Sequence, residues 1–264
     1  ETAPPEVNGV AMTVGHLVEG MRSRGHRVTL VRPRPTAGAP GRDDVTVRGL
    51  PLPGYPGVRF GLPAVGFLRR RWRAERPDVV HVVTEGPLGW SAVLCARSLG
   101  IPVTSGFHTN FDHYSTHYGL GWLRPLIAAY LRGLHRKAGA TLVPTSALAA
   151  ELAGAGIPGV RVVGRGVDTD LFDSARRCPA LRLSWGAAES DLVCLYVGRL
   201  AAEKNLALVE RSFAEIRRSH PSARLVWVGD GPSREALASR GLPQHFAGWR
   251  RDAELATHYA SADL

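Results

Sequence analysis

Short apolar runs alternate with longer amphipathic stretches along almost the whole chain. The apolar runs have the length of strands, and the stretches between them repeat apolar residues at helical spacing. This alternation is typical of βα units built around parallel sheets. It predicts strands at Arg27–Val31, Asp78–Val83, Pro102–Gly106, Thr141–Val143 and Arg161–Val163, and a second series at Leu192–Val197, Arg224–Val228 and His245–Ala247.

The stretches between these runs predict the helices of both series. They lie at Val10–Ser23, Leu88–Leu99, Trp122–Lys137 and Ala147–Ala155, and at Leu206–Arg218, Arg234–Ser239 and Ala253–Ser261. The predicted fold class is α/β, with two Rossmann-like doubly wound domains that face a ligand cleft. We place the first domain at residues 1–164, a hinge or linker at 165–190 and the second domain at 191–264.

Both ends of the chain fall inside a predicted domain. The chain begins at Glu1 in a loop that leads into a helix, so we expect the first strand of the first domain to be missing. Leu264 stands where a new strand begins, so we expect the second domain to be incomplete. We therefore interpret the sequence as a fragment of a longer protein.

The composition is that of a globular protein, with 44% hydrophobic and 21% charged residues. No stretch approaches the roughly 18 apolar residues that a membrane-spanning helix needs, and no charged-then-apolar signal segment opens the chain. These features favour a cytoplasmic location. Cys95, Cys178 and Cys194 form no close pair, which argues against a disulfide framework and against a zinc site.

The net charge of +10 lies entirely in the first part of the chain. Residues through Arg165 include 20 basic and 10 acidic side chains, whereas the remainder includes 13 of each. No nucleic-acid-binding motif accompanies this charge, so we expect no nucleic-acid partner. An anionic membrane surface fits better, because Phe67–Arg73 combines apolar, aromatic and arginine side chains in a predicted helix. The alternative is an ordinary amphipathic helix with a solvated basic face.

Two cations, Arg199 and Lys204, stand between a predicted strand and the helix that follows it. Helix N-terminal amides favour negative charge, arginine offers a planar fork to phosphate oxygens, and lysine adds a mobile point charge. The pair therefore predicts a diphosphate site. Of the 33 basic residues only Lys137 and Lys204 are lysine, so Lys204 also stands out by composition. Two solvated charges at a helix start are the alternative.

Two segments of the first domain carry further candidates for substrate binding. Asn8 and Gly9 lie in a turn before a helix, where glycine lets backbone amides approach an anion; a plain turn is the alternative. His108 and Asn110 follow a buried strand, at the end that faces the ligand crevice of such folds. We predict that His108 contacts the sugar, with a histidine hydrogen-bonded inside its own domain as the alternative.

Glycine turns follow two strands of the second domain. Gly229 and Gly231 are predicted to hold a nucleotide against the backbone, although the full dinucleotide fingerprint is absent. Gly248 and Trp249 end the next strand and are predicted to line a base-binding pocket through the main chain. For Trp249, packing at the domain surface is the alternative.

We predict no metal site. Asp168–Asp170 matches a short metal-binding pattern, but it lies in the hinge, where turn or cap roles are favoured. His113 and His117 have the spacing of zinc ligands on a helix, but no third ligand accompanies them.

The motifs of the chain also occur in a characteristic order: Pro5–Val10, Thr84–Gly89, His108–Phe111, Gly164–Asp168, Gly198–Leu200, Glu203–Asn205, Gly229–Pro232 and Phe246–Gly248. This ordered set resembles the retaining GT-B glycosyltransferases of family 4, and the match covers nearly the whole chain. Within the family it is most similar to GDP-mannose-dependent alpha-mannosyltransferases that act on glycolipids. Sulfoquinovosyl and other UDP-sugar transferases share much of the pattern.

The resemblance implies a hexosyltransferase with a nucleotide-sugar donor, GDP-mannose or another, and a lipid or glycan acceptor. It implies that Arg199, Lys204 and the Gly9 loop hold the diphosphate and that His108 contacts the transferred hexose. The Phe246–Arg250 turn would border the base. No metal or other cofactor is required, because the two cations neutralise the departing diphosphate. The location it favours is cytoplasmic, with peripheral attachment to the inner face of the plasma membrane.

One feature of the family is missing. Its members carry two glutamates separated by seven residues shortly after the strand expected at Leu264, and the chain stops before them. The resemblance therefore implies that the 264 residues are inactive or impaired as given, whereas the parent protein is a transferase. A nucleotide-sugar-binding module without catalysis is the alternative function for this fragment.

Overall fold

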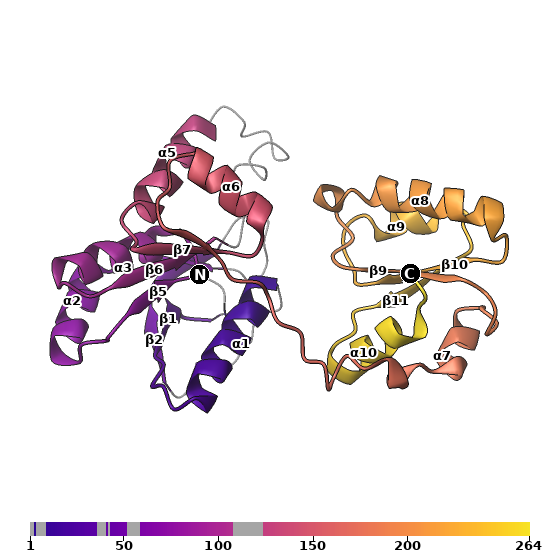
Figure 1. Cartoon of the computed structure of the whole chain (residues 1–264), viewed down its shortest axis with the longest axis horizontal. Helices are drawn as coiled ribbons and strands as arrows, with labels where there is room; N and C mark the ends of the chain where they lie inside the picture. The colour runs from indigo at the N-terminus through magenta and orange to yellow at the C-terminus, as the bar shows by residue number, and fades with distance from the viewer. Residues whose placement is uncertain (1–2, 4–8, 36–40, 42, 52–58, 108–123) are drawn as a thin grey trace. The chain divides into compact units, whose positions relative to one another are not determined.

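The computed structural model describes residues 3, 9–35, 41, 43–51, 59–107 and 124–264. The chain forms two compact units, Glu1–Arg165 and Gly166–Leu264 (Figure 1). Each unit is built on a parallel sheet with helices packed against it. This is the α/β architecture that the alternation of apolar runs predicts.

The first unit is centred on a parallel sheet in the order β5-β6-β7-β8. Helix α3 packs on β5 and β6, α6 packs on β7 and β8, and α2 packs on α3. Its helices and the strands of this sheet are α1 (Gly9–Ser23), α2 (Val65–Ala74), β5 (Val80–Val82), α3 (Pro87–Ser98), β6 (Val103–Gly106), α5 (Arg124–His135), β7 (Ala140–Val143), α6 (Ser146–Gly154) and β8 (Val160–Val162).

The core of the first unit lies where α2 and α3 meet the sheet. Leu68 and Trp72 project from α2 into a cluster that includes Val93 of α3 and Leu134 of α5. All four side chains are buried. Burial of side chains of this size stabilises the fold by roughly 1.5–3 kcal/mol each. These contacts hold α2 against the sheet.

Three short strands in this unit were not predicted. They are β2 (Asp44–Val47), which pairs in parallel with β1 (Leu30–Pro33), and the antiparallel pair β3 (Gly49–Pro51) and β4 (Arg59–Gly61). The strand predicted at Arg27–Val31 is shifted along the chain to Leu30–Pro33, and so includes Arg32. The Arg32 side chain is buried and lies 3.9 Å from the carboxylate of Asp44, so a charge that marked the end of a strand in the sequence lies inside one.

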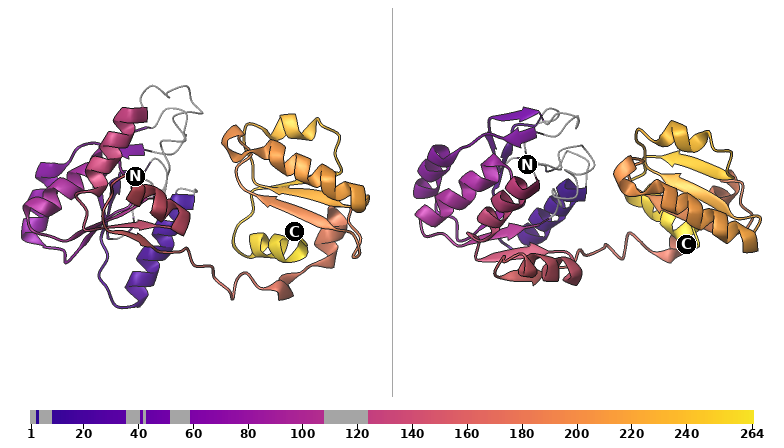
Figure 2. Two further views of the ribbon diagram at one scale, coloured as in Figure 1. Left: turned by 45° about the horizontal axis from the view of Figure 1, so that its top comes forward. Right: turned by 90° about the horizontal axis from the view of Figure 1, so that it is seen from above.

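The second unit has a parallel sheet in the order β11-β10-β9. Helices α8 and α9 cover one face, and α7 and α10 cover the other (Figure 1); two further views agree (Figure 2). Its elements are η2 (Ser174–Arg176), α7 (Pro179–Ser184), β9 (Val193–Val197), η3 (Ala202–Lys204), α8 (Leu206–Ser219), β10 (Arg224–Val228), α9 (Arg234–Ala238), β11 (Gln244–Gly248) and α10 (Asp252–Ser261).

The central strand β10 explains why this sheet is covered on both faces. Leu225 and Trp227 belong to one core cluster together with Phe213 of α8. Val226 and Val228, the alternate residues, belong to a second cluster with Trp185. Because successive side chains of a strand point to opposite faces, an unbroken apolar run predicts burial on both sides.

Arg182 ties α7 to the rest of the second unit. Its side chain is 1% exposed, and Nη1 donates to the Ser261 carbonyl at 2.8 Å and to the Asp263 carboxylate at 2.9 Å. The same carboxylate accepts the amide of Val193 at 2.9 Å. Beyond it, the Leu195 amide of β9 donates to the carbonyl of Leu264 at 2.8 Å. The backbone at Leu264 therefore pairs beside β9, where a strand was expected to begin.

Asp168 has the turn role that the sequence favoured. Its Oδ1 accepts the backbone amides of Asp170 at 3.1 Å and Leu171 at 3.0 Å. Aspartate commonly stabilises a turn in this way.

Candidate functional site

The candidate site lies at the carboxyl edge of the second unit's sheet, where one turn follows each strand. Backbone hydrogen bonds join the three turns. The Leu200 amide donates to the carbonyl of Asp230, and the Gly229 amide donates to the carbonyl of Gly248, both at 2.9 Å. We call these turns, residues 198–205, 229–233 and 248–252, the three-turn frame. Ligands of open α/β sheets bind at this edge.

Two glycines allow the first two turns to approach each other. A Cβ atom at Gly229 would lie under 3.0 Å from the carbonyl oxygen of Gly198, and one at Gly231 would also lie under 3.0 Å from that of Leu200. Gly229 also has a φ of 129°, which residues with side chains rarely adopt. The absence of a side chain at both positions therefore allows the first two turns to pack closely against each other. Their contact with a nucleotide stays a prediction.

Arg199 is held by a carboxylate of the motif Glu203–Asn205, for which the sequence predicted no role. The guanidinium Nη2 pairs with Oε1 of Glu203, whose side chain is only 9% exposed. The phenol of Tyr196 donates to the Arg199 carbonyl at 3.3 Å. Burial raises the pKa of Tyr196, and the charge of Glu203 raises it further. Arg199 is thus part of a partly buried polar cluster rather than a solvated charge at a helix start.

Lys204 ends the short helix η3, directly before α8, and its side chain is exposed. The next residue, Asn205, has a φ of 50° and makes no side-chain hydrogen bond that caps α8. The first turn of a helix carries amides without partners inside the helix and a partial positive charge. Lys204 and the start of α8 together favour an anion at this turn.

The third turn of the frame follows β11. Gly248 has a φ of 72°, and the Trp249 side chain after it is 53% exposed. Arg250 donates through Nη1 to the Trp249 carbonyl at 2.9 Å. Like α8, helix α10 begins without a side-chain cap. Contact of Gly248 or Trp249 with a base stays a prediction.

The candidates of the first unit are described only in part. Asn8, His108 and Asn110 lie outside the described residues. Gly9 is the first residue of α1, and among the described atoms none lies within 4 Å of a Cβ built on it. The buried side chain of Phe107 precedes His108.

The first unit contains a buried polar cluster that was not predicted from the sequence. His135 is fully buried; its Nδ1 lies 2.9 Å from Oγ of Ser105, and its Nε2 lies 3.6 Å from Oε1 of Glu85. Ser105 and Thr141 are joined through their hydroxyl oxygens at 3.0 Å. Glu85 belongs to the motif Thr84–Gly89, but nothing in the spacing of these residues indicated that they meet.

The basic helix α2 differs from its predicted arrangement. Leu68 and Trp72 are buried in the core, so the expectation that these apolar side chains enter a membrane is wrong for them. Phe67 is 41% exposed, and Arg69 and Arg70 are exposed beside it. The helix therefore offers one aromatic side chain and a row of arginines to solvent.

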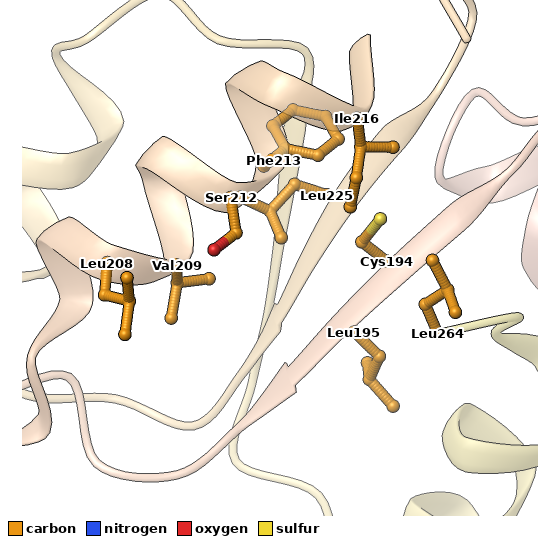
Figure 3. A pocket seen from close by; sticks show the side chains of 9 residues that line it. All are labelled: Cys194, Leu195, Leu208, Val209, Ser212, Phe213, Ile216, Leu225 and Leu264. Atoms are coloured by element: carbon orange, nitrogen blue, oxygen red, sulfur yellow. The ribbon is translucent and has the colours of Figure 1, made fainter. Parts of the chain in front are cut away.

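An apolar groove of about 290 Å³ lies beside β9 and α8 (Figure 3). Apart from the Ser212 hydroxyl and the Cys194 thiol, its lining side chains are hydrocarbon. Leu264 lies at one end of it. The groove has no charged side chain and so lacks the chemistry of a phosphate site.

The described residues contain no helix that is long and apolar enough to cross a bilayer. Within the same residues, His, Cys, Asp and Glu side chains form no group of three or more that could hold a metal ion.

Residues 7–171 match the family model described as Glycosyltransferase Family 4, and residues 191–264 match the model described as Glycosyl transferases group 1. The chain belongs to glycosyltransferase family 4. This confirms the resemblance that the ordered motifs predicted, and with it a hexosyltransferase as the class of enzyme.

Individual relatives agree with this assignment. A GDP-mannose-dependent alpha-mannosyltransferase of Mycobacterium tuberculosis is 34% identical over 271 residues, covering 100% of this chain and 70% of the relative. A sulfoquinovosyl transferase of Arabidopsis thaliana is 32% identical, covering 82% of this chain and 43% of the relative. The structure of Anabaena HepE in complex with UDP-glucose has a TM-score of 0.66 at 16% identity, covering 99% of this chain and 70% of that chain. The family 4 enzyme thus has the predicted GT-B fold.

Proposed function

We propose that this family 4 glycosyltransferase moves mannose from GDP-mannose to a lipid or glycan acceptor, with retention of configuration at the sugar. The observation that carries the proposal is the three-turn frame, which brings Arg199, Lys204 and the start of α8 to one edge of the sheet. The donor is supported by the similarity to the mycobacterial mannosyltransferase.

In this proposal the frame binds the diphosphate of the donor. Arg199 and Lys204 stabilise the negative charge that develops on the leaving diphosphate, and amides at the start of α8 add hydrogen bonds. These groups supply the charge compensation, so the transfer needs no metal ion. The fixed backbone of the frame means that little reorganisation is required when the charge develops.

A titration tests the donor site. GDP should bind the chain, and Arg199→Ala or Lys204→Ala should weaken binding roughly tenfold or more, since a hydrogen bond to a charged group contributes about 1.5–3 kcal/mol. Arg218→Ala is the matched control, because Arg218 is an exposed arginine of α8 paired with Glu215. Unchanged GDP affinity in both site variants would contradict the proposed site.

Transfer is tested separately with labelled GDP-mannose and lipid acceptors. Formation of a labelled lipid supports the proposed transferase activity. Binding of GDP without transfer supports the alternative that these residues act as a nucleotide-sugar-binding module.

A UDP-sugar donor is the second candidate. It is supported by the sulfoquinovosyl transferase, which is 32% identical to this chain. Parallel titrations with GDP and UDP, followed by transfer assays with GDP-mannose and UDP-glucose, separate the two donors. Preference for the UDP compounds in both assays would replace the GDP-mannose assignment.

We place the acceptor at an anionic membrane surface on the cytoplasmic side. Phe67 and the exposed arginines of α2 would enter the head-group region. Each arginine near such a surface contributes about 1 kcal/mol, so replacing Arg69 and Arg70 together by glutamine should weaken vesicle binding roughly 30-fold. The control replaces Arg211 and Arg218, which are exposed on α8. An equal loss of vesicle binding in both double variants would contradict this surface. So would binding of the unaltered chain to duplex DNA that is as tight as its binding to vesicles at the same salt concentration.

A further inference from the structure

Glu203 carries a largely buried carboxylate to which the proposed function gives no role. Its side chain is 9% exposed, whereas Lys204, the next residue, is exposed. Burial of a carboxylate is costly unless an opposite charge or hydrogen bonds compensate it. The compensating group is the guanidinium of Arg199, which pairs with Glu203 through Nη2. The local structure therefore couples a largely buried acid to a cation of the proposed diphosphate site.

We infer that Glu203 is a positioning residue that orients the guanidinium of Arg199 toward the diphosphate of the donor; the inference rests on the proposed function. Guanidinium is planar and carries five N–H donors in a rigid fork. A carboxylate bound at Nη2 therefore sets the direction of the other donors. The class of ligand that Glu203 helps to recognise is a nucleoside diphosphate.

Hydrogen bonds fix the backbone around the pair, and the contact with Glu203 orders the side chain of Arg199. The Tyr196 phenol holds the Arg199 carbonyl at 3.3 Å. The Leu200 amide donates to the Asp230 carbonyl at 2.9 Å, and the Lys204 amide donates to the Ala201 carbonyl at 3.0 Å. These bonds hold both ends of the turn that carries the pair. A long arginine side chain otherwise loses much rotamer freedom when it binds a ligand.

Glu203 also brings a negative charge close to a site for an anion. Repulsion alone would make its removal favourable for binding, whereas loss of orientation makes its removal unfavourable. The two effects have opposite signs, so a neutral replacement distinguishes them. We expect orientation to dominate, because the charges of Arg199 and Lys204 offset that of Glu203.

The test compares GDP and guanosine as ligands of the full chain and of Glu203→Gln. The variant should bind GDP roughly tenfold more weakly, as for loss of one charge-assisted contact. Guanosine affinity should not change, because guanosine has no phosphate. In an Arg199→Ala background the substitution should have no further effect, since it acts through Arg199. The loss should persist at high salt, where long-range charge effects are screened.

Glu210→Gln is the matched control. Glu210 has a side chain that is also 9% exposed, and it also pairs with an arginine, Arg240. This control should leave GDP affinity unchanged, which separates positioning of Arg199 from the general effect of neutralising a buried glutamate. If Glu203→Gln does not fold by thermal melting, Glu203→Asp takes its place, since the shorter acid should also misplace the guanidinium.

The outcomes separate this inference from the proposed function. Unchanged or tighter GDP binding by the Glu203 variant overturns the inference alone, as does an equal loss in the Arg199→Ala background. Should the unaltered chain bind neither GDP nor UDP, the proposed function and the inference fall together.

Discussion

A Cβ atom at Gly229 would overlap the carbonyl oxygen of Gly198. These residues follow two neighbouring strands, so their close approach sets the distance between two turns of the three-turn frame. The amide of Gly198 also donates to the carbonyl of Val228 at 2.9 Å, next to this contact. Any side chain at position 229 must therefore separate the turns.

Gly229→Ala should destabilise the second unit. The added methyl group forces the turns apart, and the φ of 129° is unfavourable for alanine. Overpacking of this kind costs about 1–3 kcal/mol, which urea denaturation would detect. Gly166→Ala is the control, because no described atom lies within 4 Å of a Cβ at that position; it should change stability by no more than about 0.5 kcal/mol. Equal stability of the two variants would contradict the packing role.

The stability of the second unit should fall in acid partly through Asp263. Burial raises the pKa of this carboxyl, but the Val193 amide and the guanidinium groups of Arg182 and Arg177 outweigh it, so the pKa lies below its usual value. The unfolded chain therefore takes up the proton at a higher pH than the folded chain. The stabilisation is complete above the unfolded pKa of about 3.9 and is lost as the pH falls through the folded value.

Asp263→Asn should remove this acid-sensitive component. At neutral pH it should also lower the free energy of unfolding by about 1.5–3 kcal/mol, because it weakens hydrogen bonds to a buried cation. Urea denaturation from pH 7 to pH 2 measures both effects. A variant whose pH dependence matches that of the unaltered chain would show that Asp263 is not the group responsible.

Ser105→Ala should destabilise the first unit through its buried polar cluster. The substitution removes a hydroxyl that lies 2.9 Å from Nδ1 of His135 and 3.0 Å from Oγ1 of Thr141. Leaving buried polar groups without a partner costs about 1–3 kcal/mol. Ser98→Ala, at an exposed residue whose hydroxyl donates to the Cys95 carbonyl of its own helix, is the comparison for thermal unfolding. A loss of stability no larger than that of Ser98→Ala would argue against a stabilising role for the cluster.

Substitution of Phe67 and of Trp72, both on α2, should affect two different properties of the protein. Trp72→Ala should cost about 3–5 kcal/mol of stability, since Trp72 lies in the core. Phe67→Ala should leave stability nearly unchanged and weaken binding to anionic vesicles, because Phe67 is 41% exposed. Thermal unfolding and vesicle sedimentation measure the two effects. Vesicle binding that is insensitive to Phe67→Ala would remove this side chain from the proposed membrane surface.

The strands β9 and β10 were predictable because the apolar runs Leu192–Val197 and Leu225–Val228 are uninterrupted. The predicted strand at Arg224–Val228 coincides with β10, and the one at Leu192–Val197 differs from β9 by one residue. The strands β3 and β4 were not predictable in the same way. Each is three residues long, and the Gly49 and Pro51 of β3 read as turn residues.

The sequence indicated the cations of the site but not their partners. Arg199 was predictable from its place after a strand and before a helix. Its pairing with Glu203 depends on the path of the turn, because the two residues do not share one helix and no helical spacing rule applies. His135 and Glu85 are 50 residues apart and meet only through the packing of α5 on the sheet.

The bonds that join the three-turn frame come from the main chain. The exposed side chain of Lys204 takes no part in them, so exchanging this residue alters the charge offered to a ligand while the frame keeps its shape. Exchanging Arg199 also removes the cation that pairs with Glu203, so there a change in ligand binding is coupled to a change in stability. A variant library at position 204 would therefore vary donor binding while holding the stability of the second unit constant.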